Sequence, residues 1–197
     1  MALTSKHVQQ FEAALPHSAT RSPGPGSLRP FRVLFDERYE ACRSFAASAR
    51  RLGCGTQSIA GDVTAVWFND LEASWARGEG TMFGMTTRSS LFCLEQLASN
   101  HWMRVTARIE HRAEPQGAVR HQLHSPEPTL QQAASVLATD ADWPARLAAP
   151  LLEGLRDARG ERRAASIVVT NSSVPDASRV SLVTWTISAP EARQAQV

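Results

Sequence analysis

The stretch FRVLFDERYEACRSFAASARRLG, residues 31–53, contains the pattern from which the fold of this chain is predicted. A short apolar run is stopped by Asp36, and the residues after it are apolar at spacings of three and four until Gly53. The short run is typical of a buried parallel strand, and the spacing is typical of an amphipathic helix that covers it. Asp36 and Gly53 suit the start and the end of that helix.

The same alternation continues to Arg112 and predicts an α/β fold. We expect a mostly parallel three-layer sheet with a flavodoxin-like or Rossmann-like order of elements. Right-handed crossovers would bring the strands side by side, with helices on both faces. The four predicted parallel strands lie near residues 31–36, 56–60, 81–85 and 103–109.

The second half of the chain has a less regular pattern. Residues 113–128 are polar and rich in proline, and we expect a loop excursion there. Helical patterns follow near residues 130–138 and 143–159. Two β-branched runs, 166–170 and 180–188, predict a C-terminal antiparallel hairpin that extends the sheet.

The first thirty residues differ in composition from the rest. Residues 1–30 end in a segment rich in proline and glycine, which predicts an extended arm. Such a segment orders poorly without a surface to lie on, so we expect the arm to lie across another chain. Residues 31–197 then form a single α/β domain.

The overall composition excludes several classes of protein. Hydrophobic residues make up 43% and charged residues 20%, which is typical of a globular chain rather than a disordered one. The net charge of +2 is too small to indicate a nucleic-acid partner. No apolar run approaches about 18 residues, so we expect no membrane span. The N-terminus has no signal-peptide pattern and the three cysteines show no pair spacing, so we expect a cytoplasmic protein.

The basic residues are almost all of one kind, because every one except Lys6 is arginine. This bias fits a GC-rich bacterial genome, which favours arginine codons. It also fits a protein that binds carboxylates or phosphates, since arginine contacts these groups bidentately.

The best candidate for a ligand site is the edge at which the parallel strands end. The segment GMTTRSS, residues 84–90, places small hydroxyl residues at a helix start, where free N–H groups and the helix dipole attract anions. The alternative is that Thr86 or Thr87 only caps the helix, and that Asp36 is a cap beside solvated charges. The residues assigned to this ligand site are Asp36, Arg38, Thr86, Thr87, His111 and Arg112.

Histidines suggest further chemistry. His111 follows Glu110 at the end of the predicted fourth strand, where it could act as a general base oriented by that carboxylate, or be a plain surface residue. His121 and His124 lack the further ligands that a metal site needs. No nucleophile elbow, Walker loop or dinucleotide fingerprint occurs. We therefore predict no metal and no cofactor, and leave the catalytic residues unassigned.

Two tryptophans suggest a protein interface. Trp67 and Trp75 are eight residues apart and lie on nearly the same face of a predicted helix. They could form an aromatic surface for a partner subunit, since tryptophan is enriched in interface anchors. The alternative is a helix that simply covers the sheet.

Three functions are compatible with these patterns. The favoured one is a non-catalytic accessory or structural subunit of a larger bacterial protein assembly, which suits the arm and the many tryptophans. The second is a small enzyme acting on an anionic small molecule at the strand ends, and the third is a ligand-binding sensor domain that uses the same crevice. Fold alone does not decide among them. The expected partners are other protein subunits or an anionic small molecule, with no nucleic acid and no membrane.

Overall fold

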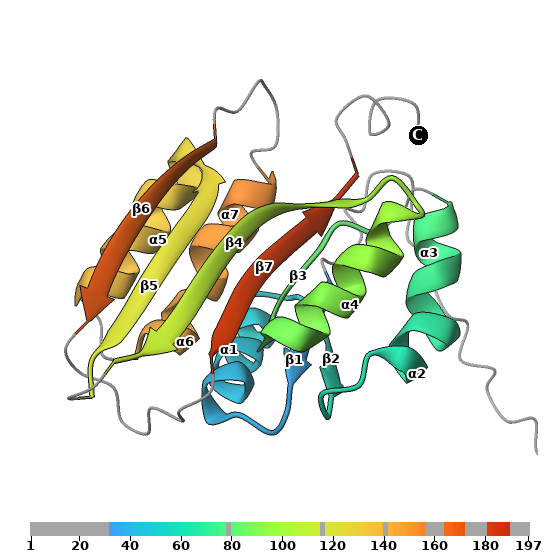
Figure 1. Ribbon diagram of the computed structural model, residues 1–197, viewed down its shortest axis with the longest axis horizontal. Helices are drawn as coiled ribbons and strands as arrows, with labels where there is room; N and C mark the ends of the chain where they lie inside the picture. The colour runs from blue at the N-terminus through green and yellow to red at the C-terminus, as the bar shows by residue number, and fades with distance from the viewer. Residues whose placement is uncertain are drawn as a thin grey trace, which may run out of the picture.

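The fold is taken from a computed structural model (Figure 1). It describes residues 32–77, 80–114, 117–139, 142–156, 164–171 and 181–189. The predicted arm at residues 1–30 lies outside the described residues. In chain order the elements are β1 (Arg32–Asp36), α1 (Glu40–Arg51), β2 (Gly55–Ile59), α2 (Thr64–Val66), the π-helical turn η1 (Trp67–Leu71), α3 (Glu72–Ala76), β3 (Met82–Thr87), α4 (Arg88–Ser99), β4 (Arg104–Ala113), β5 (Val119–Pro126), α5 (Glu127–Thr139), α6 (Trp143–Arg146), α7 (Ala148–Arg156), β6 (Ala164–Asn171) and β7 (Leu182–Ser188).

The predicted α/β class is confirmed, but the sheet is mixed rather than mostly parallel. Its seven strands lie in the order β2-β1-β3-β7-β4-β5-β6. Strand β1 pairs parallel with β2 and β3, while the other four pairings are antiparallel. β4 runs in the direction of β1 to β3, because two antiparallel pairings separate it from β3. It does not lie beside them, so the flavodoxin-like order is not found.

The C-terminal hairpin predicted from residues 166–170 and 180–188 is wrong. Strand β6 pairs with β5 at the edge of the sheet, whereas β7 lies in the centre between β3 and β4. The physical reason is the difference in burial. Every residue of β7 is buried, as expected for a strand covered on both faces, while alternate residues of β6 are exposed.

The loop excursion predicted over residues 113–128 is also replaced by regular structure. β5 occupies residues 119–126 and pairs antiparallel with β4, and α5 starts at Glu127. Alternate residues of β5 are buried, but two of the buried positions are His121 and Ser125. These polar residues conceal the alternation that would otherwise predict a strand.

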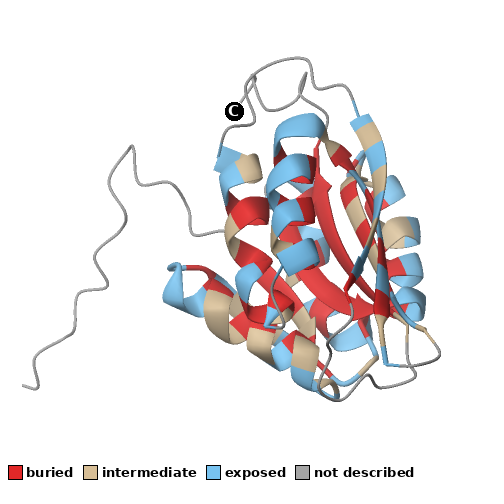
Figure 2. Cartoon of the chain, turned by 90° about the vertical axis from the view of Figure 1, so that its left-hand side faces the viewer, coloured by how far each residue is buried: buried red, intermediate tan, exposed pale blue. Residues whose placement is uncertain are grey.

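Helices cover the two halves of the sheet differently. One buried cluster joins the sheet to α1, α5, α6 and α7, and a second cluster on the other face joins it to η1, α3 and α4. In Figure 1, α3 and α4 lie in front of the half that contains β1 and β3, whereas β5 and β6 have helices only behind them. The predicted three-layer arrangement therefore does not extend over the whole sheet. Figure 2 shows the buried strands between exposed helix surfaces.

The centre of the sheet depends on Trp185 of β7. This residue lies opposite Gly84 of β3, and a Cβ at Gly84 would collide with the indole and with the carbonyl oxygen of Leu34. The indole N–H donates a hydrogen bond of 3.0 Å to Thr86 Oγ1. Gly84 is thus required for close packing of three neighbouring strands. Among the described residues, no helix has the length and apolar character needed to cross a membrane.

Candidate functional site

Asp36 and Arg38 form a bidentate ion pair at the carboxyl end of β1. Arg38 donates from Nε to Oδ1 over 2.9 Å and from Nη2 to Oδ2 over 2.7 Å. The Asp36 side chain is fully buried, while that of Arg38 is 47% exposed. The hydrogen bond from the guanidinium to Asp36 raises the pKa of Arg38 above its ordinary value. Arg38 thus remains a cation with one face in solvent.

Gly61 joins this pair to helix α4. Its φ is +90°, a conformation that glycine adopts readily, and a Cβ there would collide with the Arg38 guanidinium. The Gly61 carbonyl accepts a hydrogen bond of 2.9 Å from Ser90 Oγ in the first turn of α4. The Ser90 N–H in turn donates to Thr87 Oγ1, the N-cap of α4, over 3.3 Å. The predicted residues Arg38 and Thr87 are therefore brought together through Gly61 and Ser90.

Thr86 belongs to the core rather than to the strand-end cluster. Its side chain is fully buried and accepts the hydrogen bond from Trp185. Successive residues of a strand point to opposite faces, so Thr86 and Thr87 cannot both face a ligand from the same side. Thr87 caps α4, which is the alternative to an anion site that the sequence offered for these threonines.

His111 and Arg112 lie apart from the other predicted ligand residues. In the register of the sheet, Leu182 of β7 stands between Thr87 and His111, so the two backbones are about 10 Å apart. His111 is buried on the helix-covered face, whereas the neighbouring Glu110 and Arg112 point to the other face. Neither interpretation of His111 offered by the sequence holds. Glu110 does not orient it as a general base, because adjacent residues of a strand diverge, and it is not a surface residue, because its side chain is buried.

His111 instead forms a buried pair with His121 of β5. Their Nδ1 atoms are 2.7 Å apart, and His111 Nε2 lies 2.8 Å from Thr184 Oγ1. The Trp143 ring stacks on His111 at a centroid distance of 4.3 Å. One Nδ1 must carry a proton and donate a hydrogen bond, which the unprotonated Nδ1 of the other ring accepts. This arrangement suits two neutral rings.

Burial sets the ionisation of both rings. It lowers the pKa of His121 to about 4, and it lowers the pKa of His111 well below 6.5, with a further contribution from His121. His121 Nε2 is buried and has no hydrogen-bond partner among the described residues. A second N–H on His121 would therefore be buried without an acceptor, which opposes protonation.

A cluster of arginines from β4 and from the first turn of α4 surrounds Glu110, on the face of the sheet opposite His111. The carboxylate is 2.7 Å from Arg112, 3.7 Å from Arg88 and 3.9 Å from Arg108. Its side chain is only 14% exposed. One carboxylate thus forms ion pairs with three guanidinium groups.

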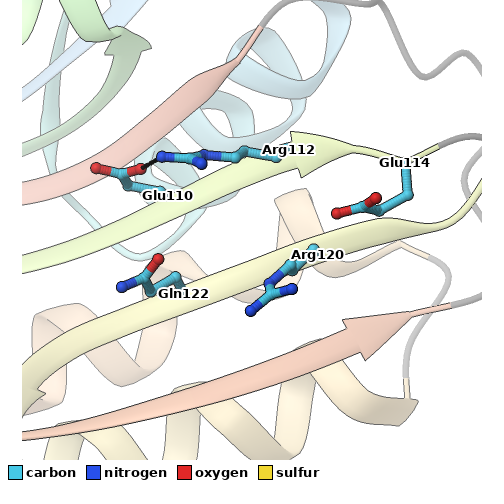
Figure 3. A pocket seen from close by; sticks show the side chains of 5 residues that line it. All are labelled: Glu110, Arg112, Glu114, Arg120 and Gln122. Carbon is cyan, nitrogen blue, oxygen red and sulfur yellow. Dashed lines mark hydrogen bonds and ion pairs between the residues drawn. The ribbon is translucent and has the colours of Figure 1, made fainter.

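A hollow of about 270 Å³ lies beside this cluster and is lined by five side chains, which Figure 3 shows: Glu110, Arg112, Glu114, Arg120 and Gln122. Arg120 lies directly across from Arg112 in the register of β4 and β5. Within the part of the chain that the structure describes, Arg120 has no ion-pair partner. Like charges placed opposite each other destabilise a sheet, so an acidic group bound here would relieve this repulsion.

The interface predicted at Trp67 and Trp75 is wrong. Both side chains are buried, with exposed fractions of 6% and 1%, and they contact each other at a ring-centroid distance of 5.7 Å. The residues that recur every four positions along this segment pack in one buried cluster with residues of the sheet: Val63, Trp67, Leu71 and Trp75. The alternative, a helix that simply covers the sheet, is therefore correct.

The exposed tryptophan is Trp102, just after α4. It is 69% exposed and has a φ of 60°, the only positive value among the described non-glycine residues. Hydrogen bonds from the N–H of Met103 to Ala98 and of Trp102 to Ser99 close the helix in the Schellman pattern. Glycine usually occupies the Trp102 position of this pattern. The sequence contained a signal for this unusual helix end. The apolar spacing of α4 ends at residue 98, and no glycine follows to end the helix.

The described residues hold no group of three or more potential metal ligands. Cys42 and Cys54 are buried and Cys93 is exposed. Burial raises the pKa of the Cys42 thiol to about 12. Comparisons with family models, with curated proteins and with solved structures found no match to this chain.

Proposed function

We propose that this protein is a non-catalytic accessory subunit that binds another protein of a larger assembly. The observation that carries the proposal is Trp102, a large exposed aromatic residue in a backbone conformation that favours glycine. A left-handed conformation costs a bulky residue about 1–2 kcal/mol. Because the indole is exposed, its burial does not offset this cost in the free energy of folding of the chain.

Among the described residues, two further aromatic side chains are exposed, and both belong to the helices on the same face of the sheet as α4. Phe68 of η1 is 68% exposed and Phe92 of α4 is 60% exposed. Tryptophan and phenylalanine are enriched in the buried centres of protein interfaces, where one or two anchors contribute most of the affinity. The partner in this proposal offers an apolar pocket for the indole of Trp102.

The test compares the native complex with the behaviour of the pure chain. A tagged chain is expressed in its source organism, and the mass of the extracted particle is measured by native mass spectrometry. The wild-type chain is expected in a hetero-complex, and Trp102→Gly is expected to run at a mass that one or two copies of this chain alone account for. Purified Trp102→Gly should unfold at an equal or higher temperature than wild type, because strain is removed.

Leu52→Ser is the matched control, since Leu52 is also exposed but follows α1. It should stay in the complex. A wild-type particle that contains only this chain contradicts the proposed function, as does a Trp102→Gly chain that remains fully in the complex.

The second candidate is the binding of an anionic small molecule at the strand ends, by an enzyme or a sensor domain. The observation that favours it is the half-exposed Arg38 beside the first turn of α4. Titration of the pure chain with inorganic phosphate and with citrate, followed by calorimetry, tests it. Binding that is lost in Arg38→Ala and retained in Arg43→Ala supports this site, whereas no binding of either anion counts against it.

A further inference from the structure

We propose that the free edge of β6 pairs with β6 of a second copy of this chain, so that two seven-stranded sheets join into one. This inference goes beyond the proposed function, because the partner is the chain itself and the surface is at the other end of the sheet from β2. It rests on the position of β6, on its composition, and on the register that a two-fold axis would impose.

The first observation is that β6 is a long, unprotected edge. It ends the sheet, so no described strand lies along its outer side. Its sequence AASIVVTN has eight residues, with no proline, glycine or charge. Natural edge strands usually carry such residues, or are short, because a regular apolar edge pairs with other chains. The other edge, β2, has five residues, begins with Gly55 and has three polar residues.

The second observation is the small number of charged residues in α5 and β6, described elements at the end of the molecule that Figure 2 faces. Helix α5 packs against β6 and β5. Of all the residues of α5 and β6, only Glu127 is charged, whereas 20% of the whole chain is charged. The exposed side chains in the middle and last part of α5 are neutral: Gln131, Gln132, Ser135, Ala138 and Thr139. Depletion of charge is the compositional mark of an interface centre.

The third observation concerns apolar residues left partly covered. Val168 is 49% exposed on the open face, and Ile167 and Val169 on the helix-covered face are only partly buried. A strand beyond β6 would cover the sides of all three.

A two-fold axis perpendicular to the sheet keeps the helix-covered faces of both copies on the same side. It also makes the new strand pairing antiparallel. Facing residues then share a face of the sheet, so one residue of β6 must lie opposite its own copy. We place Val168 on the axis. Ile167 then faces Val169, and Ser166 faces Thr170. This register pairs residues 165–171 with their copies and leaves only Ala164 without a partner in β6. Around the axis it pairs apolar with apolar and hydroxyl with hydroxyl residues, and at its ends Ala165 faces Asn171.

The proposal is tested with the purified full chain, so its outcome is independent of any other protein. Sedimentation velocity over a range of concentrations is expected to show a monomer–dimer equilibrium. Val168→Arg places two like charges opposite each other on the axis and should raise the dimer dissociation constant by more than about tenfold. Ser58→Arg, on the exposed side of the β2 edge, is the matched control and should leave it unchanged.

Cross-linking tests the register without relying on a charged variant. In a Cys93→Ser background, which removes the exposed thiol, Val168→Cys should form a disulfide-linked dimer under mild oxidation. Directly opposed Cβ atoms in antiparallel strands are about 4.5–5.5 Å apart, close to disulfide range. Ser58→Cys in the same background should not cross-link.

Each adverse outcome overturns the proposal. A wild-type chain that stays monomeric at all concentrations means that the edge is free or is covered by a different chain. A dimer that Val168→Arg does not weaken uses another surface. A dimer in which Val168→Cys does not cross-link has a different register. None of these results bears on the hetero-complex proposed through Trp102.

Discussion

Acid is expected to destabilise this protein through the buried pair His111 and His121. In the folded chain burial lowers the pKa of His121 to about 4 and that of His111 well below 6.5. An unfolded histidine has a pKa of about 6.5. The unfolded chain therefore binds more protons below that pH, so the stability from the neutral pair is complete above about pH 7.5 and falls as the pH drops.

The size of the effect follows from the two pKa values of His121. Between about pH 8 and pH 5, an unfolded histidine gains nearly one proton, while folded His121 gains about a tenth of one. Integration over this range gives a loss of about 2 kcal/mol for His121 alone. His111 adds a loss of the same sign. Because a domain is stable by only about 5–15 kcal/mol, this is a large fraction of the total.

The assay is urea unfolding at several pH values between about 5 and 8, with the free energy of unfolding extrapolated to water. His121→Leu removes one titrating group, and it also leaves His111 Nδ1 without its partner. The absolute stability therefore falls, so the readout is the difference in free energy between about pH 8 and pH 5. That difference should shrink by about 2 kcal/mol in His121→Leu.

His124 provides the control, because it lies on the same strand but is exposed on the opposite face. His124→Gln should leave the pH difference as in wild type. If His121→Leu keeps the full pH difference of wild type, then His121 is not held neutral by burial and the reasoning is refuted.

Three further predictions concern the sheet centre and the strand-end cluster. Gly84→Ala should lower the free energy of unfolding by about 1–3 kcal/mol in urea titrations, because its Cβ would meet Trp185 and the Leu34 carbonyl; a neutral effect would contradict the packing described. Thr87→Ala should cost about 1 kcal/mol in the same assay through loss of the α4 N-cap, and Thr87→Ser should recover most of it. Arg38→Ala should lower the thermal midpoint more than Arg43→Ala, since it leaves the buried Asp36 carboxylate unpaired, whereas Arg43 pairs with the exposed Glu40; equal shifts would argue against a structural role for the Asp36 pair.

The sequence predicted the parallel part of the sheet because there the pattern is local. Each short apolar run before Thr87 is followed by its own covering helix, and β1 pairs with β2 and β3 as such units require. The position of β7 could not be read in the same way. A buried apolar run indicates a central strand, but pairing between residues about a hundred positions apart leaves no periodic signal in one sequence.

The candidate site was predicted in part for a related reason. Asp36, Arg38 and Thr87 come together because they end neighbouring strands or follow them closely. His111 and Arg112 were assigned to the same site because the fourth strand was expected to belong to the same parallel array, whereas β7 lies between β3 and β4. The wrong tryptophans were chosen because helical spacing indicates which residues share a face, without indicating whether that face is buried. Trp102 was missed because helical spacing does not describe the end of α4, where this tryptophan occupies the position that glycine usually has.

The central place of β7 has a consequence for how this chain reaches its fold. Among the described strands, β1 to β3 and β4 to β6 have no direct pairing with each other, because β7 alone pairs with members of both groups. During synthesis β3 and β4 therefore each keep an unpaired edge until β7 has left the ribosome. Pairing of β7 thus joins the two parts of the sheet, and in a chain cut short before Leu182 no described strand would connect β3 to β4.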